Sequence, residues 1–385
     1  MFKIVTLNKI SETGLKHLRT SNYEISDELS NASGILVRSA SLHETVFPDT
    51  LLAISRAGAG VNNIPIDKCS ESGIVVFNTP GANANAVKEL VIAGLLLSSR
   101  DVIGGISWAK TLDENVAAQV EKGKGQFAGQ EIEGKTLGVI GLGAIGVMVA
   151  NAAKALGMTV IGYDPYISID AAWGLSKSIK RATDLKDIYE NSDYITLHLP
   201  FTPDTKEMVN DDTIAKMKDG VKILNYARAQ LVSDSAIKSA LDSGKVSCYI
   251  TDFPDGDIAK HKGVIAIPHL GASTEESEEN CAHMAAIEMR AYLEEGNILN
   301  SVNYPEVNLP RGEGKRLGVF HKNIPNMLTQ ISGEFAKLHI NIENMLNKSK
   351  KENAYTVVDV IGDIPSGIVE NLMKIDGIQR VRIID

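Results

Sequence analysis

Short apolar segments alternate with helix-like stretches along the first hundred residues. Residues 3–7, 34–37, 52–54 and 73–77 have the length and the β-branched content of buried strands. Strands that alternate with helices form parallel sheets, because each helix carries the chain back across the sheet. This pattern predicts an α/β unit, and the largely apolar residues 85–100 predict a long helix after it.

A second alternating stretch predicts a Rossmann-type, doubly wound parallel sheet. Its expected strands are residues 136–140, 159–163, 194–199, 222–225, 247–251 and 264–267. A helix from Thr274 to about residue 294, with acids in its first turn, then returns the chain to the first unit. We therefore expect a discontinuous, flavodoxin-like substrate domain over residues 1–100 and 283–310, with the nucleotide-binding domain inserted at residues 101–282.

The C-terminal part of the chain predicts a small separate domain. Prolines, glycines and asparagines give residues 301–314 the composition of a linker. Predicted strands follow at residues 317–321, 356–360 and 381–384, and predicted helices at residues 325–338 and 366–374. Their order indicates a βαββαβ domain over residues 315–385.

Three glycines occupy the predicted turn between the first strand of the second unit and its helix. Gly141 permits a tight turn, Gly143 admits a pyrophosphate, and Gly146 lets helix and strand approach. Such a motif alone is weak evidence, because many matches are ordinary turns. Here the next predicted strand ends at Asp164, whose carboxylate can accept hydrogen bonds from ribose hydroxyls and repels a ribose phosphate. The sequence therefore predicts NAD rather than NADP.

Size, charge and cysteine content narrow the functional classes. The 385 residues exceed one ordinary core, and the net charge of −9 argues against nucleic acid as the main partner. Cys69, Cys248 and Cys281 lack the spacing of a disulfide framework or a metal site, so we expect small core residues and no metal. The first strand begins at once and no apolar run approaches a membrane span, which predicts a cytoplasmic protein without membrane contact.

Two side chains could carry hydride-transfer chemistry on a 2-hydroxy acid. Arg228 and His269 each follow a predicted strand, which places them at the carboxyl edge of the sheet where ligands bind. A guanidinium suits a carboxylate, and an imidazole can exchange the hydroxyl proton. Either residue could also be an ordinary surface or structural group.

The chain resembles the D-2-hydroxyacid dehydrogenases. The similar segments are residues 56–63, 127–129, 134–143, 225–228, 251–253 and 268–274. The resemblance implies NAD-dependent oxidation of D-3-phosphoglycerate to 3-phosphohydroxypyruvate, the first step of serine biosynthesis. The alternatives are another 2-hydroxy acid substrate or, in a different class, a nonenzymatic NAD-sensing protein similar to a co-repressor. The resemblance also implies that the chain forms a homodimer or homotetramer.

The resemblance also assigns roles to residues. Arg228 would bind the substrate, His269 would exchange the proton, and Asp257 would stand in for the family glutamate that supports the histidine, although it could be an exposed loop acid. Cofactor contacts would come from Thr79, Gly141, Gly143, Ala144, Ile145, Gly146, Asp164, Tyr226, Ala227, Asp252, Gly271 and Ala272. Substrate contacts would come from Arg38, Arg56, Gly58, Ala59 and Gly60, although either arginine could be a surface ion-pair partner.

The C-terminal domain resembles ACT domains, which sense small ligands in amino-acid metabolism. By this resemblance His321, Asn323 and Asn341 would bind a serine effector at a dimer interface. Asn326 stands where the family has a flexible glycine, and asparagine adopts left-handed geometry less readily. A purely oligomerising domain is the alternative.

Overall fold

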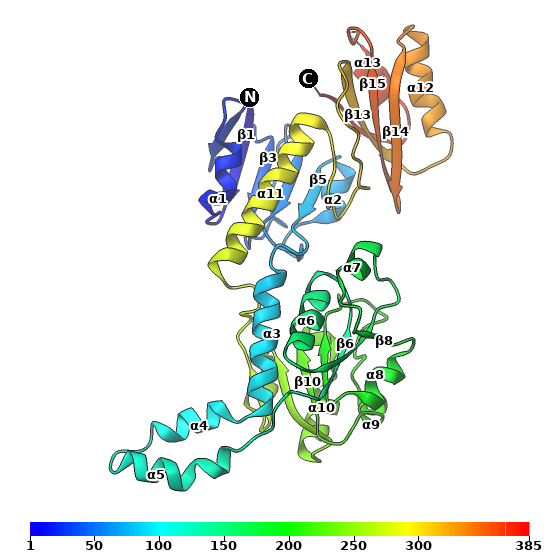
Figure 1. Cartoon of the computed structure of the whole chain (residues 1–385). Coiled ribbons are helices and arrows are strands. Elements are labelled where there is room, and N and C mark those ends of the chain that lie inside the picture. Colours follow the sequence, from blue (N-terminus) through cyan, green and yellow to red (C-terminus); the bar gives the residue numbers. More distant parts are fainter. Residues whose placement is uncertain (366, 385) are drawn as a thin grey trace. The chain divides into compact units, whose positions relative to one another are not determined.

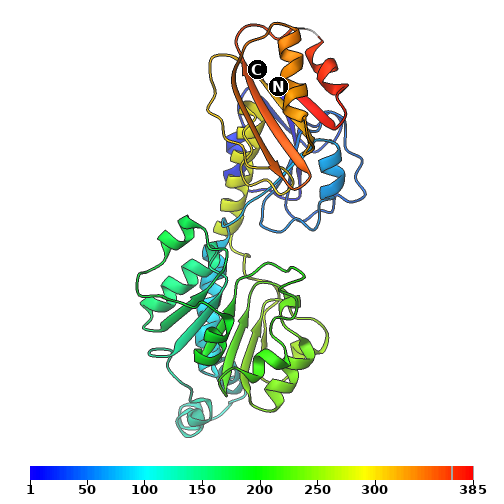
Figure 2. The ribbon, with the colours of Figure 1, turned by 90° about the vertical axis from the view of Figure 1, so that its right-hand side faces the viewer.

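The computed structural model describes residues 1–365 and 367–384. The chain forms two compact units (Figures 1 and 2). Unit 1 comprises Met1–Asn83 and Glu275–Asp385, and unit 2 comprises Ala84–Thr274. The chain therefore divides at residues 84 and 274, whereas the sequence predicted divisions near residues 100 and 282. The discontinuous organisation arises because unit 1 takes segments from both sides of unit 2.

Unit 1 contains a five-stranded parallel sheet with the order β2-β1-β3-β4-β5. Its strands are β1 (Phe2–Leu7), β2 (Tyr23–Ser26), β3 (Gly34–Val37), β4 (Ala53–Arg56) and β5 (Val75–Asn78). This is the flavodoxin-like order predicted for the substrate domain. The carboxyl end of β4 leads directly into the predicted substrate loop.

Helices cover both faces of this sheet. Helix α11 (Glu275–Glu295) and the short α1 (Glu12–Leu15) lie on one face, where Ala285 and Met289 pack with Ala53 and Phe77. Helix α2 (Ile66–Glu71) belongs to the other face, where Cys69 packs with Ile54. Burial of apolar groups on both faces explains why these strands read as short apolar runs.

The C-terminal part of unit 1 is a four-stranded antiparallel sheet with the order β14-β15-β13-β16 (Figure 1). Its elements are β13 (Lys315–Lys322), α12 (Met327–Lys337), β14 (Ile342–Lys350), β15 (Asn353–Val360), α13 (Ile368–Met373) and β16 (Ile378–Ile384). The order is the predicted βαββαβ, and we call these residues the C-terminal module. Ser366, the predicted start of the second helix, and Asp385, the predicted end of the domain, lie outside the described residues.

The segment predicted to be a linker is packed against its surroundings. Tyr304 and Val307 are fully buried, and the Tyr304 hydroxyl donates to the Ser70 carbonyl oxygen (2.7 Å). The aromatic ring of Tyr304 also contacts Phe320 of the C-terminal module. Proline and glycine content correctly indicated the absence of regular structure, but it does not report whether a segment is buried.

A buried arginine joins the C-terminal module to the rest of unit 1. Arg316 forms a two-point ion pair with Asp359 (2.6 and 2.9 Å) and donates to the carbonyl oxygens of Glu295, Leu309 and Pro310. The side chains of both partners are almost completely buried. Every donor direction of the planar guanidinium is thus directed at an acceptor.

Unit 2 contains a seven-stranded parallel sheet with the order β12-β11-β10-β9-β6-β7-β8. Its strands are β6 (Thr136–Ile140), β7 (Thr159–Tyr163), β8 (Lys180–Arg181), β9 (Tyr194–Leu197), β10 (Val221–Asn225), β11 (Val246–Thr251) and β12 (Val264–Ala266). The strand order reverses between β6 and β9. Ligands bind at the carboxyl end of such a reversal in doubly wound sheets.

The helices of unit 2 include a hairpin arm that extends away from the sheet (Figure 1). They are α3 (Ala84–Ser99), α4 (Val102–Ala109), α5 (Val116–Gly123), α6 (Ala144–Ala155), α7 (Ile169–Gly174), α8 (Leu185–Asn191), α9 (Asp211–Ala215) and α10 (Asp234–Asp242). Within the described residues no single helix has both the length and the apolar composition to cross a membrane, although α3 and α4, bent by 71°, pass that test as a pair.

The three cysteines are free and buried. Burial raises the pKa of the Cys69 thiol to about 12 and that of Cys248 to about 11. In residues 1–365 and 367–384, no group of three or more His, Cys, Asp or Glu side chains could hold a metal ion. The cysteines are therefore small core residues, as their spacing indicated.

Candidate active site

The glycine turn of unit 2 has an open space above its middle glycine. Gly141 has φ +91°, and a Cβ there would collide with the carbonyl oxygen of His198. A Cβ on Gly146 would collide with the carbonyl oxygen of Gly141, so only glycine lets α6 pack this closely. Nothing lies within 4 Å of a Cβ built on Gly143. The turn can therefore admit a pyrophosphate at Gly143.

A helix terminus and a carboxylate lie beside this turn. Ala144 and Ile145 open the 12-residue helix α6, so its first amide donors follow the turn directly. Asp164 follows β7, and its carboxylate accepts hydrogen bonds from the amides of Leu142 and Tyr166 (both 2.8 Å). These bonds fix the carboxylate while leaving lone pairs for ribose hydroxyls. The arrangement fits the adenosine side of a dinucleotide.

The loop that carries Arg228 is fixed by a buried asparagine that the sequence interpretation did not single out. Asn225, the last residue of β10, accepts through Oδ1 from the amides of Ala227 (3.1 Å) and Arg228 (3.3 Å). Its Nδ2 donates to the Arg228 carbonyl oxygen (2.8 Å). Arg228 itself is exposed at the carboxyl edge of the sheet, and its Nη1 donates to the Ala227 carbonyl oxygen (2.6 Å). The neighbouring Tyr226 side chain turns into the core, so its backbone is the part left at the edge.

His269 follows β12 at the same edge and has an unusual backbone. Its φ is +56°, a left-handed conformation that costs free energy for a residue with a side chain. Asp252, 1% exposed, accepts hydrogen bonds from the next two amides, those of Leu270 (2.7 Å) and Gly271 (2.8 Å). The ring of Phe253 lies 4.7 Å from the imidazole, centroid to centroid, and tilted by 54°. Phe253 therefore contacts the imidazole itself, and Asp252 fixes the backbone that follows it.

Burial also changes the charge behaviour of this loop. Desolvation raises the pKa of the Asp252 carboxyl above its ordinary value, although the amides of Gly271 and Leu270 act in the opposite direction. A Cβ on Gly271 would approach the Asp252 Oδ2 within 2.8 Å, so glycine is needed for this clamp. Ala272 follows directly in the same loop.

Asp257 lies in the short 3₁₀ helix Gly256–Lys260, and it is exposed. Among the described residues, no hydrogen bond or ion pair joins Asp257 to His269. The structure thus gives the imidazole a ring contact and a backbone clamp, whereas the supporting role of Asp257 stays a prediction.

A second histidine lies at the strand-order reversal. His198 follows β9, and its Nε2 is 3.0 Å from the Thr196 hydroxyl. The Nδ1 atom is buried without a hydrogen-bond partner among the described residues, and burial lowers the pKa of this imidazole to about 3. It is therefore neutral near pH 7 and cannot deliver a proton as imidazolium. Its position directly after β9 was the signal that could have drawn attention to it.

In unit 1, the predicted substrate loop begins at the end of β4. The Arg56 Nε donates to the Arg38 carbonyl oxygen (3.0 Å), and its guanidinium lies over Gly58, where φ is +151° and a Cβ would collide with it. Asn78 Nδ2 donates to the carbonyl oxygen of Ala59 (2.6 Å), the residue before Gly60. These hydrogen bonds therefore connect the loop to the ends of β3 and β5.

The other two predicted contacts in unit 1 differ in accessibility. The Arg38 guanidinium forms a 2.7 Å ion pair with Glu278 of α11, and both side chains are about half exposed. This pairing agrees with the surface ion-pair alternative for Arg38. Thr79 is fully buried, and its amide donates to the Gly58 carbonyl oxygen (3.1 Å).

In the C-terminal module, the three predicted effector residues do not come together within one chain. His321 is 2% exposed, and both ring nitrogens are engaged, at 2.9 Å from the Lys322 carbonyl oxygen and the Thr356 hydroxyl. Asn323 follows the same end of β13, whereas Asn341 precedes β14 at the opposite end of the sheet. The set could converge only across two chains.

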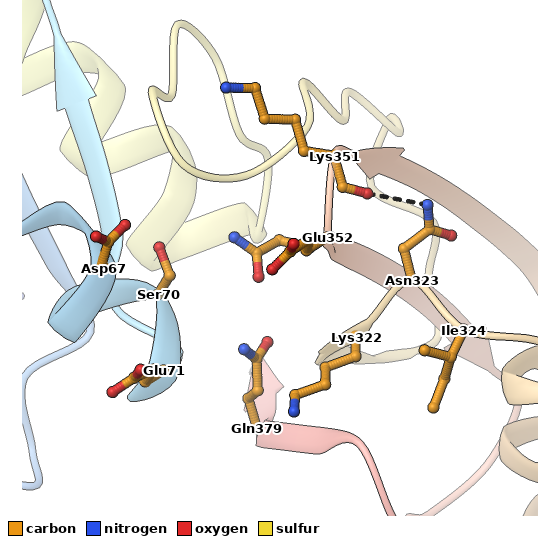
Figure 3. Close-up of a pocket in the computed structure, with 10 residues that line it drawn as sticks. Asp67, Ser70, Glu71, Lys322, Asn323, Ile324, Lys351, Glu352 and Gln379 are labelled. Atoms are coloured by element: carbon orange, nitrogen blue, oxygen red, sulfur yellow. Dashed lines mark hydrogen bonds between the residues drawn. The ribbon is translucent and has the colours of Figure 1, made fainter.

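Asn323 lines a polar groove within unit 1 (Figure 3). The groove has a volume of about 570 Å³. Asp67, Ser70 and Glu71 of α2 form one wall, and Lys322, Asn323, Ile324, Lys351, Glu352, Asn353 and Gln379 of the C-terminal module form the other. Asn323 Nδ2 donates to the Lys351 carbonyl oxygen (3.1 Å), which leaves its Oδ1 as an acceptor.

Asn326, which stands where the family has a flexible glycine, does adopt the left-handed conformation, with φ +70°.

The doubly wound sheet, the open glycine turn and the acid after β7 together define a dinucleotide-binding protein. A family model described as "D-isomer specific 2-hydroxyacid dehydrogenase, NAD binding domain" matches residues 104–271. D-3-phosphoglycerate dehydrogenase of Haemophilus influenzae is 33% identical over 87% of this chain and 81% of its own length. The chain belongs to the D-2-hydroxyacid dehydrogenase family, among the D-3-phosphoglycerate dehydrogenases.

Other relatives agree with this assignment. The Bacillus subtilis D-3-phosphoglycerate dehydrogenase is 32% identical over 88% of this chain, which spans 64% of that relative's length. The crystal structure of NAD⁺-bound 3-phosphoglycerate dehydrogenase from Entamoeba histolytica has a TM-score of 0.63 and 27% identity, covering 78% of this chain and 98% of its own. The protein is accordingly an NAD-dependent oxidoreductase, as the sequence predicted.

Proposed function

We propose that the chain oxidises D-3-phosphoglycerate to 3-phosphohydroxypyruvate, the entry reaction of serine synthesis. One observation supports this most directly: Arg228 and His269 follow β10 and β12 of one parallel sheet, so both reach the carboxyl edge that also carries the glycine turn. A cation for the substrate carboxylate and an imidazole for its hydroxyl proton are the two groups that this oxidation requires.

The proposed roles follow from these positions. His269 accepts the proton of the C2 hydroxyl group as the carbonyl forms, and Arg228 binds the carboxylate and the developing carbonyl oxygen. Asp252 positions His269 through the Leu270 and Gly271 amides. Asp257 supports the imidazolium only if its loop moves or a water molecule intervenes.

The cofactor would be held by groups that fit it. The space at Gly143 and the start of α6 suit the pyrophosphate, and the Asp164 carboxylate suits the ribose hydroxyls. NAD, when bound, supplies the acceptor for the substrate hydride. In unit 1, the Arg56 guanidinium and the loop Gly58–Gly60 are proposed to bind the anionic groups of the substrate.

A substrate comparison tests the proposal. We expect the purified chain to reduce NAD⁺ with D-3-phosphoglycerate at a kcat/KM at least about 100-fold above that with D-glycerate, because D-glycerate has no phosphate to bind Arg56 and the loop amides. Absorbance at the NADH band measures both rates. Equal rates would contradict a dedicated phosphate site. If the chain oxidises another 2-hydroxy acid and not D-3-phosphoglycerate, that acid is the substrate.

We further propose that a small amino acid such as L-serine binds the C-terminal module. The groove supports this, since the α2 carboxylates suit an ammonium group and Lys322 suits a carboxylate (Figure 3). L-serine is expected to raise the melting temperature and change the NAD-reduction kinetics, and Asn323→Ala should weaken both effects. D-serine is the control. No effect of L-serine on stability or kinetics would contradict the effector role.

The oligomeric state is also a proposal. Helix α4 exposes Val102, Ile103 and Ile106, each over 40% exposed, on the arm of unit 2. An exposed apolar row of this kind favours a homo-oligomer, because its burial between chains would be favourable. Light scattering on the purified chain measures the state, and a monomer at micromolar concentration would contradict it.

A further inference from the structure

Helix α11 buries a carboxyl group within unit 1. Glu288 is 2% exposed, although its neighbours on the covered face are apolar residues such as Ala285 and Met289. Its Oε1 accepts a hydrogen bond from Asn300 Nδ2 (2.7 Å), and its Oε2 is buried with no hydrogen-bond partner among the described residues. Burying a carboxyl group with one donor is unfavourable compared with an apolar side chain.

Two other buried hydroxyl groups share this part of the sheet. Ala53 and Ala57 pack in the same cluster as α11, and strand alternation places Ser55, between them, on the same face. Ser55 Oγ and Thr79 Oγ1 are both buried without a hydrogen-bond partner among the described residues. Buried polar groups therefore occur on α11, within β4 and directly after β5, where apolar side chains would give a more stable core.

Hydrogen bonds connect Glu288 to the loop. Asn300 is held by Glu288 and accepts a long hydrogen bond (3.4 Å) from the Asn78 amide through its carbonyl oxygen. The Asn78 side chain in turn donates to the Ala59 carbonyl oxygen (2.6 Å). Asn300 has φ +51°, a conformation that needs such support. The chain of contacts runs from α11 to the middle of the loop Gly58–Gly60.

We propose that Glu288, in its neutral form, is a positioning residue for the substrate loop Gly58–Gly60, and that its ionisation loosens this loop. The proposal rests on the proposed function of the loop in binding substrate. Neutral Glu288 is compatible with an apolar surrounding, whereas the anion needs more donors than Asn300 provides. The anion therefore draws water into this part of unit 1, and the entering water displaces the Asn300 segment and weakens the Asn78–Ala59 bond.

Burial raises the pKa of Glu288 to about 8, against the effect of the Asn300 hydrogen bond. Burial raises the pKa of Tyr292, one turn along α11, above its ordinary value. At the other end of the network Arg38 is paired with Glu278, and Arg56 stays cationic throughout. A transition between pH 7 and 9 that is lost in Glu288→Gln therefore belongs to Glu288.

Glu288→Gln separates the two forms, because glutamine keeps the acceptor for Asn300 and cannot ionise. Hydrogen exchange of residues 56–62, corrected for intrinsic exchange, should increase several-fold from pH 7 to pH 9 in the natural chain and stay flat in Glu288→Gln. The KM for D-3-phosphoglycerate should rise roughly fivefold over the same range in the natural chain only, with the NADH Kd unchanged. Glu276→Gln, exposed on the same helix, should behave like the natural chain.

Glu288→Leu is a second test, because leucine has no acceptor for the Asn300 side chain. It should raise both the loop exchange and the KM at every pH, with little change in kcat. An equal alkaline response in Glu288→Gln, or changes that merely follow a lower melting temperature, would overturn the positioning role. The exchange measurement needs no substrate, so an inactive natural chain would contradict the proposed function without deciding this inference.

Discussion

At the scale of single residues, the imidazole of His269 packs against Phe253, and its left-handed backbone precedes an amide bound by Asp252. We expect His269→Asn to lower kcat by about 100- to 10,000-fold, the usual contribution of a proton-exchanging side chain. The Kd for NADH should change less than about twofold, because the glycine turn and Asp164 are untouched. Stopped-flow turnover and fluorescence titration measure the two quantities.

His261→Asn is the matched control, because His261 follows the 3₁₀ helix Gly256–Lys260 in unit 2 and its ring contacts a neighbouring carbonyl oxygen and Asp242. It should leave both quantities unchanged. Near-normal turnover in His269→Asn would contradict the proton-exchange role.

Only part of this residue-level arrangement was predictable from the sequence. Arg228, His269 and Asp164 could be selected because each directly follows a strand, and strand ends are set by local pattern. The cage around Arg228 made by Asn225 could not, since it depends on where the chain folds back. The Asp252 clamp likewise joins residues 18 and 19 positions apart. The sequence analysis predicted that Asp252 contacts the cofactor, whereas in the structure its carboxylate accepts from the Leu270 and Gly271 amides.

At the scale of elements, the glycine turn allows binding and packing to be tested separately. Gly143→Ala adds a methyl group where nothing lies within 4 Å, so the melting temperature should change by less than about 2 °C while the NADH Kd rises at least about tenfold. Gly146→Ala forces a Cβ onto the Gly141 carbonyl oxygen, so it should destabilise the fold by about 1–3 kcal/mol.

Calorimetry and NADH titration on the two variants measure these effects. Equal loss of stability in both variants would contradict the assignment of Gly143 to phosphate binding.

Element prediction succeeded where a face is buried and failed where it is exposed. The predicted strands of the two parallel sheets lie within two residues of those observed, because burial on both sides leaves a continuous apolar run. Strands β2, β8 and β14 were not located, since all three lie at sheet edges and carry polar side chains. Helices α4 and α5 have no buried residue, so no apolar period marks them.

At the scale of the whole molecule, Arg316 fixes the C-terminal module to the rest of unit 1. Arg316→Met should destabilise the chain by about 3–5 kcal/mol, because it leaves Asp359 buried without its partner. The double variant Arg316→Met/Asp359→Leu should recover part of that loss but not all, since three carbonyl oxygens still lack their donor. Denaturant unfolding measures both.

Lys337→Met is a control, because its ion pair with Glu334 is exposed on the lysine side and should contribute less than about 1 kcal/mol. A loss below about 1 kcal/mol in Arg316→Met would contradict the fixed attachment.

The order in which the units can form follows from the division of the chain at residues 84 and 274. Unit 2 is one continuous stretch, so it can fold while it leaves the ribosome. The strands β1–β5 are synthesised earlier, but the helix α11 that covers one face of their sheet is translated only after all of unit 2. At about 5–20 residues per second, that face stays uncovered for on the order of ten to forty seconds in each nascent chain. During this interval the N-terminal segment of the nascent chain exposes apolar surface, and we expect it to need protection by chaperones.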